Sequence, residues 1–408
     1  MRLYKVKRIF ASFIIITILL TIQVLHKNTT NESSAYVDSL QKSVKFSESE
    51  NVIDPEELLL STEESFFPVT EELKAVSSGK REIYWPASLY LTILAYDPPP
   101  YLIWREGNKP FREARCQEYR CFFTTRHSLV KDMRFDSILF SPDKNLKYLP
   151  IFENRRRNQT FVYFNLIPPT FHSSFKNGKD FFNISMTYRS DSDIYLPLGK
   201  VVPKPSAPKS ESFRERLIQS AGNSSTKYNK SKLIATASVC KNPYLIELQK
   251  IIEVDNFGDC GSKSFKLLYN ADYSEFFNNM SNTYKFFLIP EIFACTHYVH
   301  MLVFEVLKYD LVPVIYASDV RKILPVHSYI DATNLSPQVL ANKLKDIDKN
   351  DVAYRQYFWW KNHFNVKSFT ESTRDAFCEL CELLHRKRSS QIRDINQWQL
   401  GNEKCRKI

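Results

Sequence analysis

Short apolar segments with the pattern of strands alternate with segments of helical pattern through the second half of this chain. Strands are predicted at residues 232–237, 285–289 and 312–316. Helical patterns lie between them at residues 244–252 and 299–309. Strands that are joined by helices pair in parallel with their neighbours. The sequence therefore predicts an α/β fold with parallel sheets.

The first half of the folded region also contains short strands rich in β-branched and aromatic residues. They are predicted at residues 89–96, 136–140 and 160–164. A stretch rich in Pro, Ser and Lys, residues 201–211, separates the two halves and is the best candidate for a domain boundary. We therefore predict two α/β domains that face a cleft, at residues 81–210 and 211–408.

The N-terminus has the pattern of a membrane anchor. Four basic residues within a short tail, residues 1–8, precede an apolar run at residues 9–25. The run has a length near the lower limit for a bilayer span, and no small-residue cleavage site follows it. Basic residues before the run place the rest of the chain in the lumen. A cleaved signal peptide is the alternative, with the same topology. Residues 26–80, rich in Ser, Glu and Asp, predict a flexible stem.

Glycosylation sequons agree with a lumenal location. The candidate acceptors are Asn31, Asn158, Asn183, Asn223, Asn229 and Asn279. In an oxidising lumen the eight cysteines are natural disulfide candidates. The net charge of +11 then suits an anionic small substrate, and nucleic acid is excluded as a partner by location.

Phosphate-binding loops of two large enzyme classes are missing. The chain has eight glycines, and they form neither G-x-G-x-x-G nor G-x-x-x-x-G-K-[ST]. Dinucleotide-dependent oxidoreductases and P-loop NTPases need these loops to hold their ligands. Both classes are therefore excluded.

One long motif connects the chain to a known family. Residues 183–199 contain Met-Thr-Tyr-Arg-Ser-Asp-Ser-Asp-Ile and end in Leu-Pro-Leu-Gly. This string resembles the signature of glycosyltransferase family 10, the α1,3/α1,4-fucosyltransferases. Further blocks resemble the family in the same order, at residues 232–235, 254–261, 309–316, 357–360 and 378–385. The similarity covers residues 85–405, so the chain is identified as a member of this family.

The resemblance implies a GT-B fold and a Golgi enzyme that transfers fucose from GDP-fucose to N-acetylglucosamine of a glycoprotein glycan, with inversion. Such a reaction needs a carboxylate to take the proton of the acceptor hydroxyl. It also needs cations or other groups that stabilise the departing diphosphate. Because Lys and Arg can supply this charge, no divalent metal and no bound cofactor is expected. The implied partners are a nucleotide sugar, a glycan acceptor and the Golgi membrane.

Matching positions give the candidate site residues. The donor-binding candidates are Arg189, Lys241, Tyr284, Glu291 and Tyr298. The signature residues are Tyr188, Asp191 and Asp193. For Arg189 and the two aspartates, the alternative is an internal network of salt bridges and turns. For Glu291 it is a carboxylate at a helix start, and for the tyrosines it is ordinary core packing.

Four positions depart from the family pattern where its chemistry is clearest, and one of them is an arginine, expected after the strand at residues 232–237, that is missing here. Ile167 occupies the position of the catalytic glutamate, and Met301 and Leu302 replace the ribose-binding glutamate and the diphosphate-binding lysine. The catalytic base is therefore unknown. Two alternatives to ordinary fucosyl transfer follow. One is a catalytically impaired relative or lumenal glycan-binding protein that kept the fold, and the other is a transferase that uses another nucleotide sugar.

Cysteine spacings allow more than one interpretation. Cys378-x-x-Cys381 is compatible with zinc or redox chemistry, whereas the resemblance implies disulfides that involve Cys116, Cys121, Cys378 and Cys381. Cys295, His297 and His300 have a spacing that a metal could use, although histidines substituted at a helix start are the commoner case. The partners of Cys240, Cys260, Cys295 and Cys405 stay open.

Overall fold

The structure is a computed structural model of the chain. It describes residues 90–126, 135–142, 155–156, 158–168, 179–237, 242–259, 261–262, 264–269, 271–291, 293–295, 297–316, 320–386, 394–401 and 405–407. All of them belong to the compact unit Ser49–Ile408. The predicted tail, anchor and stem, the Asn31 sequon and Lys241 lie outside the described residues. Within the described ranges, no helix has the length and hydrophobicity that a membrane span requires.

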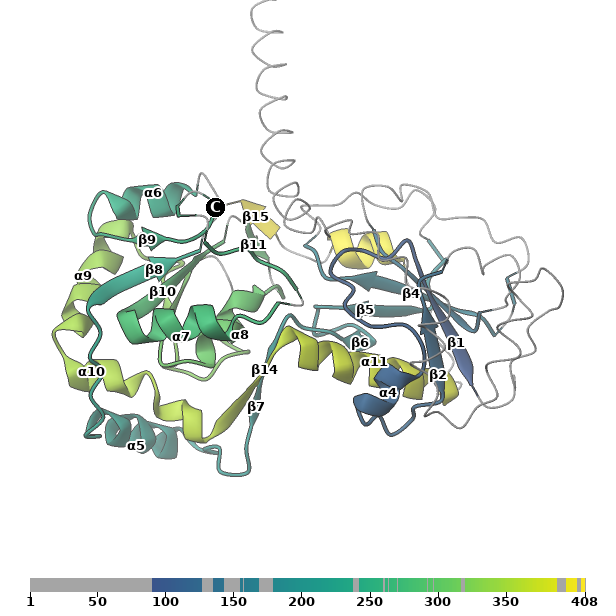
Figure 1. Cartoon of the computed structure of the whole chain (residues 1–408), viewed down its shortest axis with the longest axis horizontal. Helices are drawn as coiled ribbons and strands as arrows, with labels where there is room; N and C mark the ends of the chain where they lie inside the picture. Colours follow the sequence, from purple (N-terminus) through teal and green to yellow (C-terminus); the bar gives the residue numbers. More distant parts are fainter. Residues whose placement is uncertain are drawn as a thin grey trace, which may run out of the picture. The chain divides into compact units, whose positions relative to one another are not determined.

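Six parallel strands form the first sheet, in the order β2-β1-β3-β4-β5-β6 (Figure 1). The strands are β1 (Leu91–Tyr96), β2 (Cys121–Thr124), β3 (Ser137–Phe140), β4 (Thr160–Asn165), β5 (Ile184–Thr187) and β6 (Ile194–Tyr195). Every pairing between neighbours is parallel. The three strands that the sequence predicted in this half are confirmed, and β5 and β6 come from the signature segment.

Five parallel strands form the second sheet, in the order β13-β12-β10-β8-β9. The strands are β8 (Lys232–Thr236), β9 (Asp255–Asn256), β10 (Tyr284–Pro290), β12 (Val312–Tyr316) and β13 (Ile330–Asp331). The helices between and after them are α6 (Pro243–Gln249), α7 (Ser274–Thr283), α8 (Met301–Leu307), α9 (Pro337–Asp348) and α10 (Asp351–Gln356). The prediction of an α/β fold with parallel sheets is therefore confirmed.

Local sequence explains why these elements begin where they do. In β10, the residues from Tyr284 to Ile289 are all buried, as expected for a central strand that is covered on both faces. The helix α9 begins after Ser336, whose hydroxyl accepts a hydrogen bond from the backbone N–H of Val339. Pro337 occupies the first turn, where a missing N–H costs nothing.

The predicted domain boundary at residues 201–211 contains regular structure. The strand β7 (Lys200–Pro203) pairs antiparallel with β14 (Phe364–Lys367), so the chain crosses this region twice. The helix α5 (Glu211–Gly222) follows and contacts α10. A short helix, η3 (Trp359–Asn362), leads into β14. The boundary segment is therefore ordered through pairing with a strand near the end of the chain.

The C-terminal part of the chain returns to the first sheet. The helix α11 (Phe369–His385) contacts β1, β6 and α4 (Lys109–Glu113). Its Phe377 ring stacks on Trp104, with ring centroids 4.7 Å apart. The helix begins with a capping box between Ser368 and Glu371. Beyond it, η4 (Gln397–Gly401) precedes β15 (Cys405–Lys407), which pairs antiparallel with β11 (Phe293–Cys295).

Close packing at one glycine also joins the end of the signature motif to the helix α8. Gly199 directly precedes β7, and a Cβ atom added there would lie 2.2 Å from Cγ of Phe304 in α8. That separation is well inside van der Waals contact, so only glycine fits against this ring. The motif that ends in Gly199 therefore has a packing requirement at its last residue.

Candidate functional site

The carboxyl ends of the parallel strands in the second sheet gather polar side chains. Glu291 follows β10 directly, and its backbone N–H donates to the carbonyl oxygen of Tyr316 at the end of β12, at 3.1 Å. Asn242 follows β8, and its side-chain amide lies 3.4 Å from the carbonyl oxygen of Glu291. In open parallel sheets, ligands bind at this edge. Glu291 and Asn242 therefore mark the candidate ligand edge.

The Glu291 side chain is buried, and burial raises the pKa of its carboxyl group to about 8. Among the described residues, none donates a hydrogen bond or forms an ion pair with this carboxyl group. Its charge also raises the pKa of Tyr269, after the larger effect of burial on that phenol. A carboxyl group in this environment is protonated at neutral pH, and its O–H can donate a hydrogen bond to a ligand.

The two tyrosine candidates do not line this edge together. Tyr284 is the first residue of β10, and its hydroxyl donates to the Asp255 carboxylate at 2.5 Å. It therefore lies at the amino end of the strand whose carboxyl end carries Glu291. Tyr298 packs edge-on against Tyr188, with ring centroids 5.4 Å apart. Tyr284 and Glu291 therefore lie at opposite ends of β10, whereas Tyr298 packs against the signature motif.

Arg189 of the signature forms an internal network. Its side chain is 2% exposed, and Nε and Nη2 each donate to the Asp191 carboxylate at 2.9 Å. The guanidinium lies 4.4 Å from the ring centroid of Trp398, whose Nε1 donates to Asp191 at 3.1 Å. Burial acts to raise the pKa of Asp191, but the hydrogen bonds from Arg189 and Trp398 lower it overall. The structure thus places Arg189 in the internal network that was the alternative to a ligand contact.

The side chains of Asp193 and Tyr188 also form hydrogen bonds within the protein. The Asp193 carboxylate accepts from the backbone N–H and the hydroxyl of Ser185, both at 2.7 Å. These bonds tie β5 to the start of β6. The Tyr188 ring is buried, and the Gln399 amide donates to its hydroxyl at 3.4 Å. The signature motif therefore fixes the turn between β5 and β6 and its contact with η4.

Ile167 lies just beyond the carboxyl end of β4. Its N–H donates to Oδ1 of the buried Asn165 at 2.9 Å, and Nδ2 of Asn165 donates back to its carbonyl at 2.8 Å. The apolar side chain is partly buried and packs on the core. The isoleucine side chain cannot accept a proton, although the surrounding turn is well ordered by Asn165.

Met301 and Leu302 are buried in the first turn of α8, where they are 3% and 5% exposed. The helix begins at His300, whose Nδ1 accepts a hydrogen bond from the Leu302 N–H at 3.1 Å. Burial lowers the pKa of His300 to about 4, so the imidazole is neutral and able to accept this bond. At these two positions the first turn of α8 presents apolar side chains to the core.

Among the described residues, the Cys295, His297 and His300 side chains do not gather their ligand atoms into a metal site. Cys295 forms a disulfide with Cys405. His300 uses Nδ1 to cap α8, and His297 Nδ1 lies 3.1 Å from the Ser190 hydroxyl. The contact of His297 with Ser190 links the donor segment to the signature motif. Neither sequence pattern predicted it, because the two residues are 107 positions apart.

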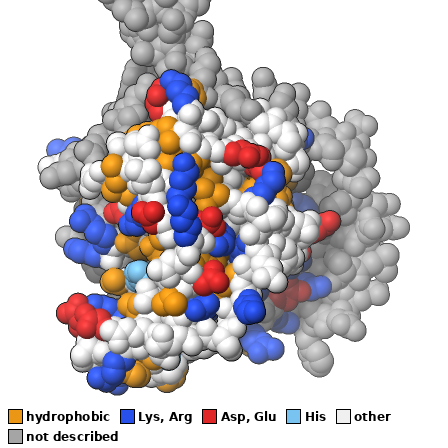
Figure 2. Space-filling view, turned by 90° about the vertical axis from the view of Figure 1, so that its left-hand side faces the viewer, with side chains coloured by type: hydrophobic (Ala, Val, Ile, Leu, Met, Phe, Trp, Pro, Cys, Tyr) orange, Lys and Arg blue, Asp and Glu red, His pale blue; other side chains and the backbone are white. Residues whose placement is uncertain are grey.

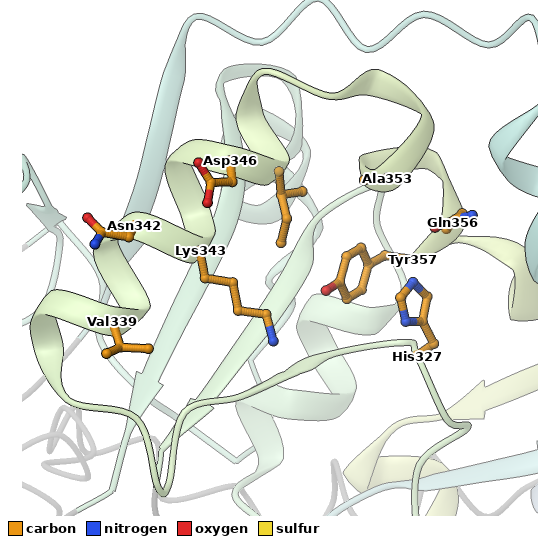
Figure 3. A pocket seen from close by; sticks show the side chains of 9 residues that line it. His327, Val339, Asn342, Lys343, Asp346, Ala353, Gln356 and Tyr357 are labelled. Carbon is orange, nitrogen blue, oxygen red and sulfur yellow. The ribbon is translucent and has the colours of Figure 1, made fainter.

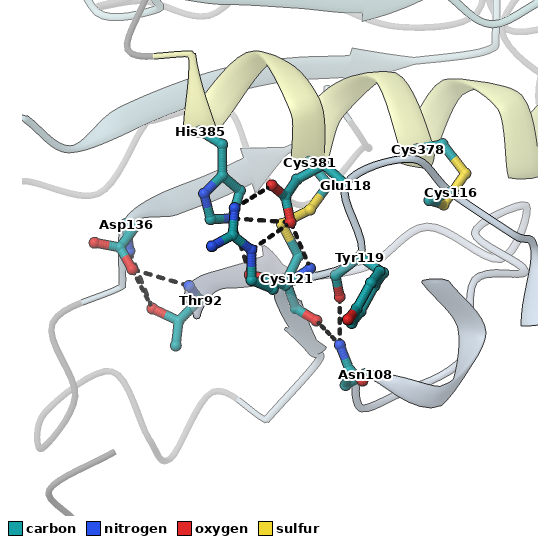
Figure 4. Close-up of a disulfide and its surroundings, with 11 residues drawn as sticks. Thr92, Asn108, Cys116, Glu118, Tyr119, Cys121, Asp136, Cys378, Cys381 and His385 are labelled. Carbon is teal, nitrogen blue, oxygen red and sulfur yellow. Dashed lines mark hydrogen bonds and ion pairs between the residues drawn. A yellow bond between two sulfur atoms is a disulfide. The ribbon is translucent and has the colours of Figure 1, made fainter. Parts of the chain in front are cut away.

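The four cysteines that the resemblance implied are joined in two disulfides, Cys116–Cys378 and Cys121–Cys381 (Figure 4). His385 lies close to the second, and within the described ranges this trio is where metal-ligating atoms come together. Its two sulfur atoms are bonded to each other, so zinc or redox chemistry is not needed to explain the C-x-x-C spacing. Nearby, hydrogen bonds from Arg120 lower the pKa of Glu118 to about 2.

Comparison with known proteins settles the family. The model of "Glycosyltransferase family 10 (fucosyltransferase) C-term" matches residues 228–398, and that of "Fucosyltransferase, N-terminal" matches residues 92–199. Together they span more than half of the chain. The chain belongs to glycosyltransferase family 10. Membership confirms the interpretation of the motif at residues 183–199 and supports a glycosyltransferase activity.

The relatives within family 10 have low sequence identity to this chain, but their alignments cover most of it. Alpha-(1,3)-fucosyltransferase C of Drosophila melanogaster is 28% identical over 292 residues, which cover 67% of this chain and 66% of that protein. The human 4-galactosyl-N-acetylglucosaminide 3-alpha-L-fucosyltransferase FUT6 is 28% identical over 326 residues, 74% of this chain and 84% of that protein. A crystal structure of an alpha1,3-fucosyltransferase with GDP-fucose aligns with a TM-score of 0.45 at 12% identity, over 74% of this chain and 92% of that one.

Proposed function

We propose that this family 10 chain transfers fucose from GDP-fucose to an N-acetylglucosamine hydroxyl of a glycoprotein glycan. The observation that carries the proposal is the pair of family models, since both are models of fucosyltransferase domains and they match both halves of the chain. The proposal includes a GT-B arrangement, with residues 81–210 as the acceptor domain and residues 211–408 as the donor domain. No divalent metal is required in this scheme.

The donor end of the reaction is assigned to the ligand edge of the second sheet. A protonated Glu291 does not repel a diphosphate, and its O–H can donate to a phosphate or ribose oxygen. Lys241 follows β8 in the sequence and is proposed to neutralise the diphosphate. Arg189 is proposed to act by positioning the β5–β6 turn through Asp191 and Trp398.

The acceptor end lacks the expected proton acceptor. Because Ile167 cannot accept a proton, we expect transfer to be slower by roughly 10² to 10⁴ than with a carboxylate at this position. Inversion at the anomeric carbon is retained in the proposal, since a direct displacement needs no covalent intermediate on the protein. The rival function is binding of a lumenal glycan without turnover, and the experiment described below distinguishes it from transfer.

We further propose that the chain is anchored in the Golgi membrane by residues 9–25 with the folded part in the lumen. Three disulfides among the described residues suit an oxidising compartment. Four sequon asparagines are exposed: Asn158, Asn223, Asn229 and Asn279. Asn183 is half-buried and its Oδ1 accepts from the Phe161 N–H at 2.8 Å, so it is the least suited acceptor among the described sequons.

Turnover by the full-length protein in detergent tests the proposal. Fucose transfer to a glycoprotein with exposed N-acetylglucosamine is measured with GDP-fucose, and GDP-mannose and UDP-galactose serve as alternative donors. Transfer from GDP-fucose that persists in EDTA supports the proposal, and transfer from another donor contradicts it. Calorimetry with GDP distinguishes the enzyme from the glycan-binding protein. Glycan binding without any GDP binding at millimolar concentration would identify a non-catalytic relative.

A further inference from the structure

A cavity of about 600 Å³ opens between α9, α10 and the loop before β13 (Figure 3). It lies toward the amino ends of the strands, because α9 and α10 meet β10 there. Lys285, the second residue of β10, bonds to Asp348 at the end of α9, and the Tyr354 hydroxyl of α10 donates to the Lys285 carbonyl at 3.0 Å. The cavity is therefore at the opposite edge of the sheet from Glu291.

Three polar groups from three different segments face this cavity, and among the described residues no hydrogen bond or ion pair engages them. They are the Lys343 ammonium of α9, the Tyr357 hydroxyl after α10 and the His327 imidazole of the loop. Nε2 of His327 is buried and forms no hydrogen bond. In Figure 3 the Lys343 and Tyr357 side chains point toward one another across the hollow. A buried polar atom that lacks a partner, as His327 Nε2 does, is unusual unless a ligand or water completes it, whereas Lys343 is exposed.

The imidazole is held firmly in this position. His327 has a left-handed backbone, with φ of 61°, inside a turn that is closed by a bond from the Ser328 N–H to the Pro325 carbonyl at 3.2 Å. Its ring stacks on Tyr357, with centroids 4.3 Å apart. The neighbouring Val326 carbonyl accepts from Trp359 Nε1 at 2.9 Å. A non-glycine residue with positive φ at a pocket wall is a feature that binding sites maintain.

The cavity lining carries one ammonium, Lys343, and one carboxylate, Asp346, so attraction for an anion comes from the Lys343 end of the cavity. Burial and the positive charge of the nearby Lys343 lower the pKa of His327, so the ammonium interacts electrostatically with the imidazole. Asp346 also lines the cavity, but its carboxylate points away from the Lys343 ammonium in Figure 3, and no ion pair joins them. Over the surrounding face, basic and acidic side chains are interspersed (Figure 2). Attraction for an anion is therefore local to the cavity.

We propose that this cavity is a second ligand site that binds the anionic group of a small molecule, a carboxylate or a tetrahedral oxyanion, through Lys343, Tyr357 and His327. The ammonium supplies charge, and the phenol supplies a directional O–H donor. The apolar side chains of Val339 and Ile347 line the rest of the hollow and leave room for an uncharged body beyond the anionic group. The site is independent of fucosyl transfer.

Calorimetry on the full-length protein in detergent tests the proposal with three probes. Sulfate represents the oxyanion, glucuronate the carboxylate, and glucose is the neutral control. We expect at least one anion to bind at millimolar concentration and glucose not to bind. Sulfate binding alone identifies an oxyanion site, and tighter binding of glucuronate identifies a site for an acidic sugar. No binding of either anion, or equal binding of glucose, overturns the proposal.

Matched variants locate the binding. Lys343→Gln removes the ammonium from an exposed helix position, and anion affinity should fall roughly tenfold or more. Lys345→Gln makes the same charge change on the exposed face of the same helix, outside the cavity, and should leave affinity unchanged. Equal losses in both variants would mean attraction to the helix surface in general and would overturn the site.

The pH dependence gives a second measurement. The groups that line the cavity with His327 are Lys343, Asp346 and Tyr357, and burial raises the pKa of Tyr357 to about 12. An anion stabilises the protonated imidazole, and because the pKa of His327 lies below its ordinary value of 6.5, affinity should rise as the pH falls below that value. His327→Gln should abolish this rise, whereas Asp346→Asn should keep it. A rise that persists in His327→Gln would remove the imidazole from the site.

Discussion

The Glu291 carboxyl group is buried where an ionised carboxylate is poorly solvated, which raises its pKa to about 8. Its unfolded pKa is near 4.5, so the folded state holds the proton more tightly. This contribution to stability is complete below about pH 4.5 and is lost as the pH rises through 8. We therefore predict that the free energy of unfolding of the wild type falls by roughly 2–4 kcal/mol between pH 5 and pH 8.5 relative to Glu291→Gln.

Urea unfolding at several pH values measures this difference. Glu215→Gln is a suitable control, because Glu215 is exposed on α5 and its substitution should give no such trend. The neutral amide in the Glu291→Gln variant keeps the size of the side chain and removes the titration. If the wild type and Glu291→Gln vary in parallel with pH, the carboxyl group titrates in the folded state as it does in water, and its proposed role as a neutral donor fails.

Trp398 covers the Arg189 guanidinium and donates to Asp191, so it completes a buried charge network. We predict that Trp398→Ala destabilises the protein by about 3–5 kcal/mol, because it removes a buried ring and one hydrogen bond of a paired charge. Trp398→Phe keeps a ring over the guanidinium and should lose less than half of that. Urea unfolding measures both, and the exposed neighbour Gln397→Ala should be neutral.

Sequence reasoning located the signature residues without settling what they do. The spacing of Tyr188, Arg189, Asp191 and Asp193 marks the family, but it is compatible with a ligand site or an internal network. The decision depends on Trp398 and Gln399, which lie more than 200 residues away in sequence. Local patterns contain no information about such a partner, so Arg189 could be named but its contacts could not.

At the scale of elements, α11 is attached to the first sheet by two disulfides whose partners are 262 and 260 residues apart. Either disulfide alone closes a loop of about 260 residues in the unfolded chain. Once one is formed, the other closes only a small additional loop. The loop-entropy relation then predicts a loss of roughly 2–3 kcal/mol for removing one pair and roughly 8 kcal/mol for removing both. The losses should therefore exceed additivity.

Cys116→Ala with Cys378→Ala, Cys121→Ala with Cys381→Ala, and the quadruple variant test this by thermal unfolding. A quadruple loss equal to the sum of the two pair losses would contradict the shared-loop argument. An unfolded quadruple variant agrees with it, provided that both pair variants fold. The measurement needs non-reducing conditions, since reductant would remove both bonds together.

Strands and helices were predictable where burial leaves a pattern in consecutive residues. β12 lies where the run Val-Pro-Val-Ile-Tyr placed it, and β10 extends one residue beyond its prediction at each end. β7 was missed because none of its four residues, Lys200–Pro203, is fully buried, so the strand leaves no burial pattern in the sequence and is defined by its pairing with β14. The Pro-rich sequence that overlaps β7 indicated a domain boundary, and the pairing of β7 with a strand roughly 160 residues later could not be seen in it.

At the scale of the whole molecule, the parallel sheets, the family and the cysteine candidates followed from the sequence, whereas contacts between distant segments did not. Gly199 against Phe304, and Ser190 beside His297, connect motifs that are each recognisable alone. The cavity at His327 left no signal in the sequence, because its three polar groups belong to different segments. Such sites depend on tertiary placement that spacing does not encode.

The proposed reaction requires a proton acceptor for the acceptor hydroxyl while the donor is bound at the ligand edge. The family places that acceptor at the position of Ile167, so this position decides the rate. Its turn is held by Asn165, and its side chain is only partly buried, so a glutamate fits with little strain. By contrast, restoring Met301→Glu and Leu302→Lys would place charges in the core of α8. We therefore predict that Ile167→Glu alone raises the rate constant kcat for fucosyl transfer by roughly 10² or more.

Ile167→Gln is the matched control, since its side chain has the same shape as glutamate and cannot take a proton at neutral pH. The gain should appear with a pH profile that rises through the carboxylate pKa and then levels, because the ionised form is the base. Equal rates for Ile167→Glu and Ile167→Gln would mean that the proton leaves by another route. An inactive Ile167→Glu that folds and binds GDP would instead show that the acceptor hydroxyl does not reach this turn.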